Sequence, residues 1–335
     1  MWLVADRRFA QSLDHFRPCI LTSDLGELIS AFPVHKGETV KRSRHHGRSK
    51  RNQPFVPAVE RLESRRLLAF TVNHTPYLQL GNAPLDGYNV GFDQAEVIWQ
   101  TTGVADTDTF TAEFRETGIT PWTSVSLNPQ IITGVSGRIN HSATFAGLAF
   151  NDDYDYRIIH LRGGSPIATY QSTFRTRLNV SDGSGFTFAT YGDSASGDPP
   201  TNFISVQNQI NALNPAFSLL LGDNVYTNGT HAEYDLRLDP SKNGALTTYN
   251  KNHIDYFGFG NHDVGYALQG PQKELLVQRF ETAFGPLNWE LRLGPLRWTA
   301  VATTEIAPPA DRGPYAAATW QFVDALEAAP RVLLS

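Results

Sequence analysis

The chain has 335 residues, of which 41% are hydrophobic and 18% are charged, and its formal net charge is −5. This length and composition predict roughly two globular domains, and the charge gives no general reason to expect nucleic-acid binding. The single cysteine, Cys19, excludes an internal disulfide and a cysteine-based zinc site, and no apolar run reaches the ~20 residues that a membrane span needs.

Residues 1–68 differ in composition from the rest of the chain. Positive charge is concentrated between Lys41 and Arg66, which predicts a solvated, disordered segment, with a nucleic-acid-binding arm as the alternative. The stretch VERLESRRLLAF, Val59 to Phe70, resembles an Arg-rich segment near the start of many exported proteins in one group of bacteria. We therefore expect a targeting segment here, and a periplasmic, extracellular or cell-surface location.

The next part of the chain, residues 69–178, has the alternating pattern of short strands separated by turn residues. The predicted strands include residues 95–101, 109–114, 154–160 and 168–174. Several short strands in a domain of this size are typical of a β-sandwich. In this domain we expect Trp99 and Tyr156 to be core residues, and His141 to be part of the fold and not a ligand.

From Ser181 onward, apolar strands alternate with helical patterns, which predicts a layered α/β domain over residues 181–335. Strands are predicted at 186–190 and 217–221, and a third strand ends at the block that begins at Phe257. Helices are predicted at 205–213, 272–283 and 316–328, two further strands between 289 and 303, and a last strand at 331–335.

Three short blocks in the α/β domain each run from an apolar strand through a glycine to a side chain that can bind metal. They are Tyr191-Gly192-Asp193, Leu221-Gly222-Asp223-Asn224-Val225-Tyr226 and Phe259-Gly260-Asn261-His262-Asp263. The carboxyl ends of parallel strands form the ligand-binding edge of an α/β sheet. Oxygen-rich donors of this kind suit a pair of hydrolytic metal ions.

These blocks resemble the motifs of the calcineurin-like metallophosphoesterase family, and specifically its purple acid phosphatase branch. Gly222-Asp223-Asn224-Val225-Tyr226 matches the Gly-Asp-x-x-Tyr motif of that family, and Gly260-Asn261-His262-Asp263 matches Gly-Asn-His-Asp/Glu. The resemblance implies a fibronectin type III-like β-sandwich followed by an α/β layered metallophosphoesterase domain. It also implies two metal ions, Fe(III) with Fe, Zn or Mn, and a phosphate ester as substrate.

The resemblance assigns a role to each residue of the blocks. Asp223 bridges the two metals, Asp193 and Tyr226 bind the first metal, and Asn261 binds the second. His262 lies at the phosphate, where it stabilises charge or protonates the leaving oxygen, and Asp263 orients His262. The nucleophile is a hydroxide generated on the metals.

The chain departs from the family pattern in two places. Ala195 stands where the first block usually has glycine, and nearby Asp198 is a competing candidate for the ligand role of Asp193. The chain also ends before the later histidine blocks of the family, so the resemblance implies an α/β domain that is incomplete at its C-terminus. His231, in an expected loop, is a candidate substitute ligand, and His253 is a weaker one.

Three functions are compatible with these patterns. The first is hydrolysis of phosphate monoesters, the second is phosphodiesterase or nucleotidase activity on the same metal centre, and the third is an inactive fragment without the later metal-binding histidines. The oligomeric state is left open by the sequence.

Overall fold

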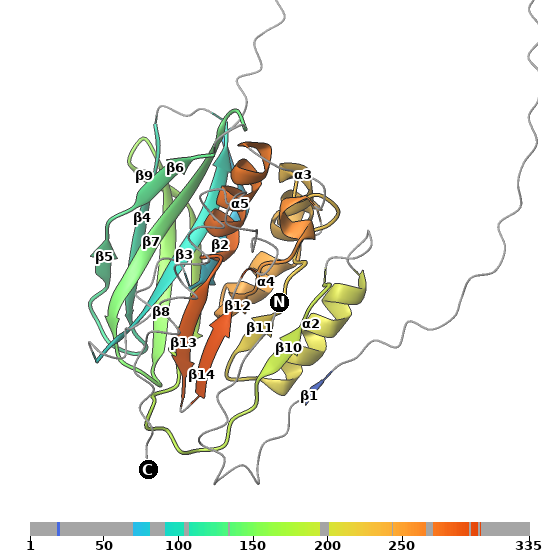
Figure 1. Cartoon of the computed structure of the whole chain (residues 1–335). Helices are drawn as coiled ribbons and strands as arrows, with labels where there is room; N and C mark the ends of the chain where they lie inside the picture. Colours follow the sequence, from blue (N-terminus) through green and yellow to red (C-terminus); the bar gives the residue numbers. More distant parts are fainter. Residues whose placement is uncertain are drawn as a thin grey trace, which may run out of the picture. The chain divides into compact units, whose positions relative to one another are not determined.

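A computed structural model describes residues 19–20, 70–80, 91–103, 107–132, 135–194, 201–242, 244–265, 271–294, 296–300 and 302. Two four-stranded antiparallel sheets occupy its first half (Figure 1). The first sheet has the strand order β2 (Thr71–Gln79), β3 (Asp93–Thr102), β7 (Arg138–Leu148) and β6 (Asn128–Ile131). The second has the order β5 (Thr123–Val125), β4 (Asp108–Glu116), β8 (Asp153–Arg162) and β9 (Ser165–Arg175).

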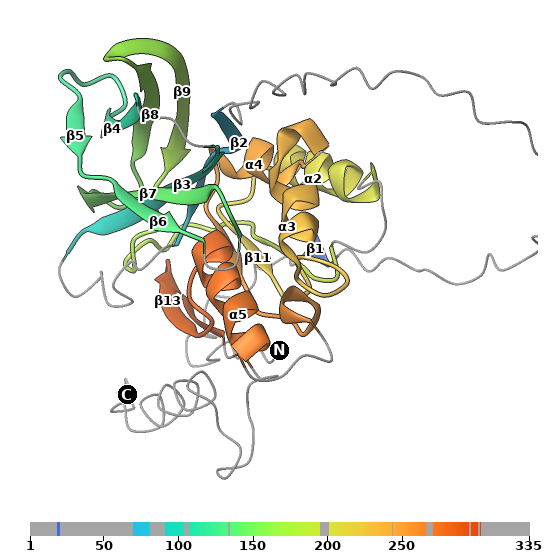
Figure 2. The same ribbon diagram turned by 90° about the horizontal axis from the view of Figure 1, so that it is seen from above.

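The two antiparallel sheets enclose an aromatic core (Figure 2). Alternate residues of β3, namely Ala95, Val97 and Trp99, belong to this core, as the period of two predicts. Trp99 and Tyr156 are buried in this core, as predicted. His141 stacks on Trp99 and bonds to the Thr101 hydroxyl at 2.9 Å, which confirms that it is a residue of the fold.

The second half of the molecule contains a parallel sheet with the order β1 (Cys19–Ile20), β10 (Ala189–Tyr191), β11 (Ser218–Leu220) and β12 (Asp255–Phe257). Helix α2 (Thr201–Leu213) connects β10 to β11, and helices α3 (His231–Leu238) and α4 (Leu246–Asn250), with the short η2 (Pro240–Lys242) between them, connect β11 to β12. The strands are in register, with Ala189 opposite Ser218 and Ser218 opposite Asp255. Strand β1 comes from the segment that the sequence predicts to be a disordered targeting segment.

After β12 the chain forms the one-turn η3 (His262–Val264), helix α5 (Pro271–Phe284) and the hairpin of β13 (Trp289–Leu293) and β14 (Leu296–Ala300). The helix and the hairpin confirm the expectations for residues 272–283 and 289–303. The glycine at the hairpin turn, Gly294, has a φ of 63°, a conformation that glycine adopts without strain. The predicted helix at 316–328, the predicted strand at 331–335 and Asp198 lie outside the described residues.

A shared core joins the antiparallel half to the α/β half. Tyr77 of β2 and Ile98 of β3 belong to the same buried cluster as Phe280 and Phe284 of α5. Tyr77 is 1% exposed, and its hydroxyl donates a hydrogen bond of 2.8 Å to the carbonyl oxygen of Ala283. Among the described residues, no helix is both long and apolar enough to cross a membrane.

Candidate metal centre

The three sequence blocks meet at one edge of the parallel sheet, because β10, β11 and β12 are parallel and in register. A glycine in the loop after each strand lets the backbones come close together. Gly260 lies against Asp223 so tightly that a Cβ at Gly260 would overlap the backbone nitrogen and Oδ1 of Asp223. Gly222 is likewise packed against the backbone of Gly260. The loops are therefore held at a spacing that only glycine permits.

Asp193 and Asp223 have the same unusual backbone conformation. Their φ angles are 52° and 53°, in the left-handed region that residues other than glycine rarely adopt. Such conformations persist only where the surrounding structure holds them, and they are frequent at functional sites. The Asp193 amide donates to the Gly222 carbonyl at 3.2 Å, which ties the two loops together.

The side chains of Asp193 and Asp223 converge on one phenol. The Tyr226 hydroxyl donates to Oδ1 of Asp193 at 2.7 Å and approaches Oδ2 of Asp223 at 3.1 Å. Burial, and then the two carboxylates, raise the pKa of Tyr226 well above its usual value. The phenol is therefore protonated at neutral pH and can donate its hydrogen to either carboxylate.

His262 lies beside this group. Its ring stacks on Tyr226 with 4.4 Å between the ring centroids, and its backbone amide donates to Oδ1 of Asp223 at 3.0 Å. Ring atom Nδ1 is 2.8 Å from the carbonyl oxygen of Thr227, which can only accept a hydrogen bond. The proton on this side of the ring is thus held at Nδ1, and Nε2 is the nitrogen that can exchange a proton.

Asp263 has different partners from those predicted. Its carboxylate accepts hydrogen bonds from the backbone amides of Val225 at 2.8 Å and Gly260 at 2.9 Å, and from the side chain of Asn224 at 3.0 Å. It therefore joins the second and third loops, while the Thr227 carbonyl contacts the ring of His262. The cause is burial, since Asp263 is fully enclosed and its oxygens satisfy amides that have no access to water. Burial also raises the pKa of Asp263 to about 7.

The fourth predicted ligand, Asn261, is half-buried and adjoins His262 on the loop after β12. Within the described ranges its side-chain amide makes no hydrogen bond. The two carboxylates and the phenol that converge form an oxygen-rich donor set, which fits hard or trivalent metal ions, and no contact joins Asn261 to them among the described residues. In the described part of the chain, no group of three or more His, Cys, Asp or Glu side chains has the geometry of a metal site. The residues present therefore fit a metal ion through oxygen ligands only, and no described histidine joins them.

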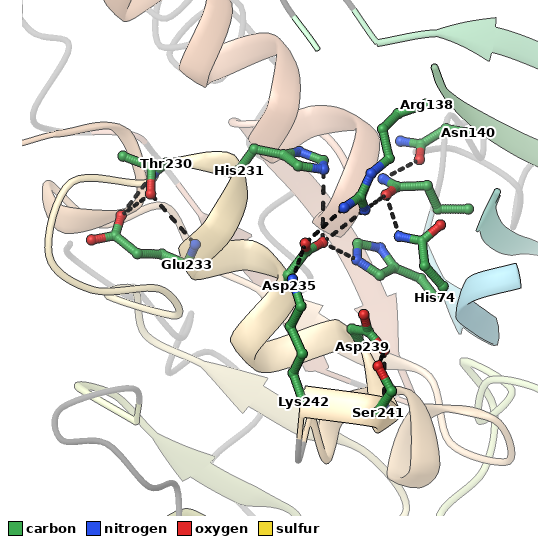
Figure 3. Close-up of polar contacts among 12 residues, drawn as sticks. His74, Arg138, Asn140, Thr230, His231, Glu233, Asp235, Asp239, Ser241 and Lys242 are labelled. Carbon is green, nitrogen blue, oxygen red and sulfur yellow. Dashed lines mark hydrogen bonds and ion pairs between the residues drawn. The ribbon is translucent and has the colours of Figure 1, made fainter. Parts of the chain in front are cut away.

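His231 does not supply the missing nitrogen ligand. It is the first residue of α3, and its Nε2 is 3.7 Å from Oδ1 of Asp235, in a cluster with His74 of β2 and Arg138 of β7 (Figure 3). This cluster adjoins a cavity of about 630 Å³ whose lining includes His231 but none of the predicted metal ligands. The chemistry places the candidate centre at the strand ends and not in this cavity. His253, before β12, lines a second cavity at the opposite ends of the strands.

Two residues of α3 that sequence reasoning missed also contact the loops of the centre. The Glu233 carboxylate accepts hydrogen bonds from the backbone amides of Thr227, Asn228 and Thr230. Arg237 contacts Asn224 and Ser194. The pattern Thr230-x-x-Glu233 is a capping box, and it could have predicted the start of this helix.

Comparison with solved structures shows which fold this arrangement shares. The structure of purple acid phosphatase PPD1 from seeds of yellow lupin (Lupinus luteus) matches with a TM-score of 0.56 and 13% sequence identity. The match covers 76% of this chain and 48% of the lupin chain, so the present chain spans about half of that protein. A glycosyl hydrolase family 2 member from Bacteroides cellulosilyticus matches with a TM-score of 0.27, which carries no structural argument. No protein-family model and no curated protein sequence matches the chain.

Proposed function

We propose that this chain belongs to a metal-dependent phosphoesterase that hydrolyses phosphate monoesters. The observation that carries the proposal is the convergence of Asp193 and Asp223, from two parallel strands, on the Tyr226 hydroxyl at 2.7 Å and 3.1 Å. The fold shared with a purple acid phosphatase supports a hydrolase of this general kind. The monoester specificity and the metal pair are our inference from the side chains.

Each residue has a role that its position supports. Asp193, Asp223 and Tyr226 would hold metal through oxygen, and Asn261 would add an amide oxygen. The chemistry that bound ions supply here is Lewis acidity toward a phosphoryl oxygen and acidification of water. His262, whose Nδ1 faces the Thr227 carbonyl, would hold a proton at Nε2 and give it to the leaving oxygen.

The first test is metal binding and hydrolysis by the purified 335-residue chain. We expect about two ions per chain by elemental analysis after loading with Fe(III) and Zn²⁺, and hydrolysis of p-nitrophenyl phosphate. Asp223→Asn should lower both metal content and turnover, turnover by about 100-fold or more, because a neutral amide is a poor ligand between two cations. Asp153→Asn is the matched control, since the side chain of Asp153 is 57% exposed on β8 and contacts Arg175.

Two outcomes would contradict the proposal. Well under one bound ion per wild-type chain would contradict the proposed metal centre. Full turnover in the Asp223→Asn variant would contradict the bridging role of Asp223. Bis-p-nitrophenyl phosphate, tested beside the monoester, separates a phosphodiesterase from a phosphomonoesterase on the same centre. Export is a further part of the proposal, and the N-terminus of protein recovered outside the cytoplasm would show whether residues 1–68 are removed.

A further inference from the structure

The guanidinium of Arg237 lies between the two loops that carry Asp193 and Asp223. Its Nε donates to the carbonyl oxygen of Asn224 at 3.0 Å, and its Nη2 donates to Ser194 Oγ at 3.0 Å. Ser194 directly follows Asp193 in the chain, and Asn224 directly follows Asp223. A single side chain thus contacts the neighbour of each predicted carboxylate ligand.

Arg237 is buried in a way that is unusual for a cation. The residue is 6% exposed, and no carboxylate of the described chain lies within ion-pair distance of it. The ring of Phe203 from α2 covers the guanidinium, with Cζ 4.1 Å from the ring centroid. Burial lowers the pKa of Arg237 to about 10, so that it is still charged at neutral pH. A buried charge without a direct ion pair is costly, and here its hydrogen bonds fix two chain segments.

Those segments need external support. Asp193 and Asp223 both have left-handed φ angles, which their own local sequence does not favour. The direct backbone tie between the loops is the hydrogen bond from Asp193 to Gly222 at 3.2 Å. The Tyr226 hydroxyl also bonds to both loops. Arg237 adds a further tie, from a helix that is fixed on its other side by Asp235.

We propose that Arg237 is a positioning residue of the candidate metal centre, and that it holds the Asp193 loop against the Asp223 loop. Its structural effect follows from the geometry of the metal-free chain. Its effect on metal binding rests on the proposed function. Hydrogen exchange measures the first effect and metal titration the second, so that failure of one is distinguished from failure of the other.

The structural effect is tested by amide hydrogen exchange in the metal-free full chain, comparing wild type, Arg237→Met and Arg237→Lys. Methionine keeps the length and packing of the stem but loses all donors. We expect the amide of Asp193 to exchange about tenfold faster or more in Arg237→Met, while amides of β3 and β8 keep their rates. Lysine has one compact donor group and should restore protection only in part.

A control separates loss of positioning from general loss of stability. Arg115 also stacks on an aromatic ring, Trp122, with 4.3 Å to the centroid, but it belongs to β4. Arg115→Met should leave exchange at Asp193 unchanged. The proposal is overturned if Arg237→Met leaves the Asp193 amide as protected as in wild type, or if the amides of β3, β8 and Asp193 all accelerate equally.

The functional effect is tested by calorimetric titration with Mn²⁺ and by kinetics with p-nitrophenyl phosphate. We expect Arg237→Met to weaken Mn²⁺ binding by about tenfold or more, and turnover to recover as Mn²⁺ is raised, because the ligands remain but are less well placed. Turnover that stays low at saturating Mn²⁺ would contradict a positioning role. If the wild-type chain binds no Mn²⁺, the proposed function fails, and the exchange experiment still decides the role of Arg237.

Discussion

Gly260 shows how a single atom limits the candidate centre. A methyl group at this position would meet the backbone and side chain of Asp223, and neither can move without moving the loop. We expect Gly260→Ala to lower the free energy of unfolding by about 1–3 kcal/mol, measured by urea denaturation, because overpacking displaces backbone here. It should also abolish metal binding.

Gly183→Ala is the control for this substitution. No atom lies within 4 Å of a Cβ at Gly183, so that variant should have the stability of wild type. Equal stability of Gly260→Ala and wild type would show that the close approach of Gly260 to Asp223 does not constrain the chain.

His141 gives the sandwich a pH dependence that can be assigned to one side chain. Burial, and then the neighbouring His160, lower the pKa of His141 to about 4. The unfolded chain, with an ordinary histidine pKa of about 6.5, therefore binds more protons than the folded chain between pH 4 and 6.5. The contribution of this residue to stability is complete above pH 6.5 and decreases as the pH falls.

The matching experiment compares urea unfolding of wild type and His141→Gln at pH 7 and pH 5. Between these values wild type should lose about 1–2 kcal/mol more than the variant, because glutamine does not titrate. Since the comparison is a difference, carboxylates elsewhere in the chain cancel. A difference that is the same at both pH values would refute the assignment.

At the scale of elements, α3 depends on its first turn. The Glu233 carboxylate accepts bonds from three backbone amides and from the Thr230 hydroxyl, and Thr230 caps the helix in return. We expect Glu233→Ala to destabilise the chain by about 1–2 kcal/mol in urea denaturation, because these amides lose their acceptor. Glu233→Gln keeps one acceptor oxygen and should lose less unfolding free energy than Glu233→Ala. A larger loss in Glu233→Gln than in Glu233→Ala would argue against the capping role.

The same helix shows where sequence reasoning succeeds and where it stops. Strand ends followed by Gly-Asp and Gly-Asn are local patterns, and the structure brings Asp193, Asp223, Tyr226 and His262 together as these patterns suggest. The sequence predicts a loop at residues 227–231 and no helix after it, whereas α3 begins at His231. The buried positions of α3 include Asp235 and Arg237, so the polar side chains that fill its interior faces conceal the apolar period.

The role of Asp263 could not be predicted for a related reason. Its carboxylate accepts hydrogen bonds from two loops, through Val225, Asn224 and Gly260. Burial in the folded chain determines that these groups are its partners. A sequence motif gives the residue type but not which buried amides lack a partner.

For the whole molecule, Asp235 is the centre of a buried polar contact between the antiparallel and α/β halves. It is 2% exposed and accepts hydrogen bonds from Arg138 at 2.9 Å, His74 at 2.8 Å and Lys242 at 2.7 Å (Figure 3). Burial alone would raise the pKa of Asp235, but these donors together hold it far below its usual value. Removal of this charge leaves the guanidinium of Arg138, which is 16% exposed, without its carboxylate partner.

We therefore expect Asp235→Asn to cost about 3–5 kcal/mol of unfolding free energy in urea denaturation. Asp153→Asn, at an exposed pair with Arg175, should change it by less than about 1 kcal/mol. Combining Asp235→Asn with Arg138→Met should cost less than the sum of the two changes, because the second substitution removes the unpaired cation. Strict additivity would mean that the Arg138–Asp235 contact carries no energy.

The two-sided arrangement of α3 determines how this protein can be divided in domain-shuffling experiments. Glu233 and Arg237 contact the loops of the candidate centre. Asp235, which belongs to the same eight-residue helix, contacts the antiparallel half. A chain cut at Ser181 would take His74 and Arg138 away from Asp235, and Tyr77 away from the core around Phe280. The α/β half is therefore not a portable module, and a hybrid that keeps the centre intact must exchange the residues of both halves together.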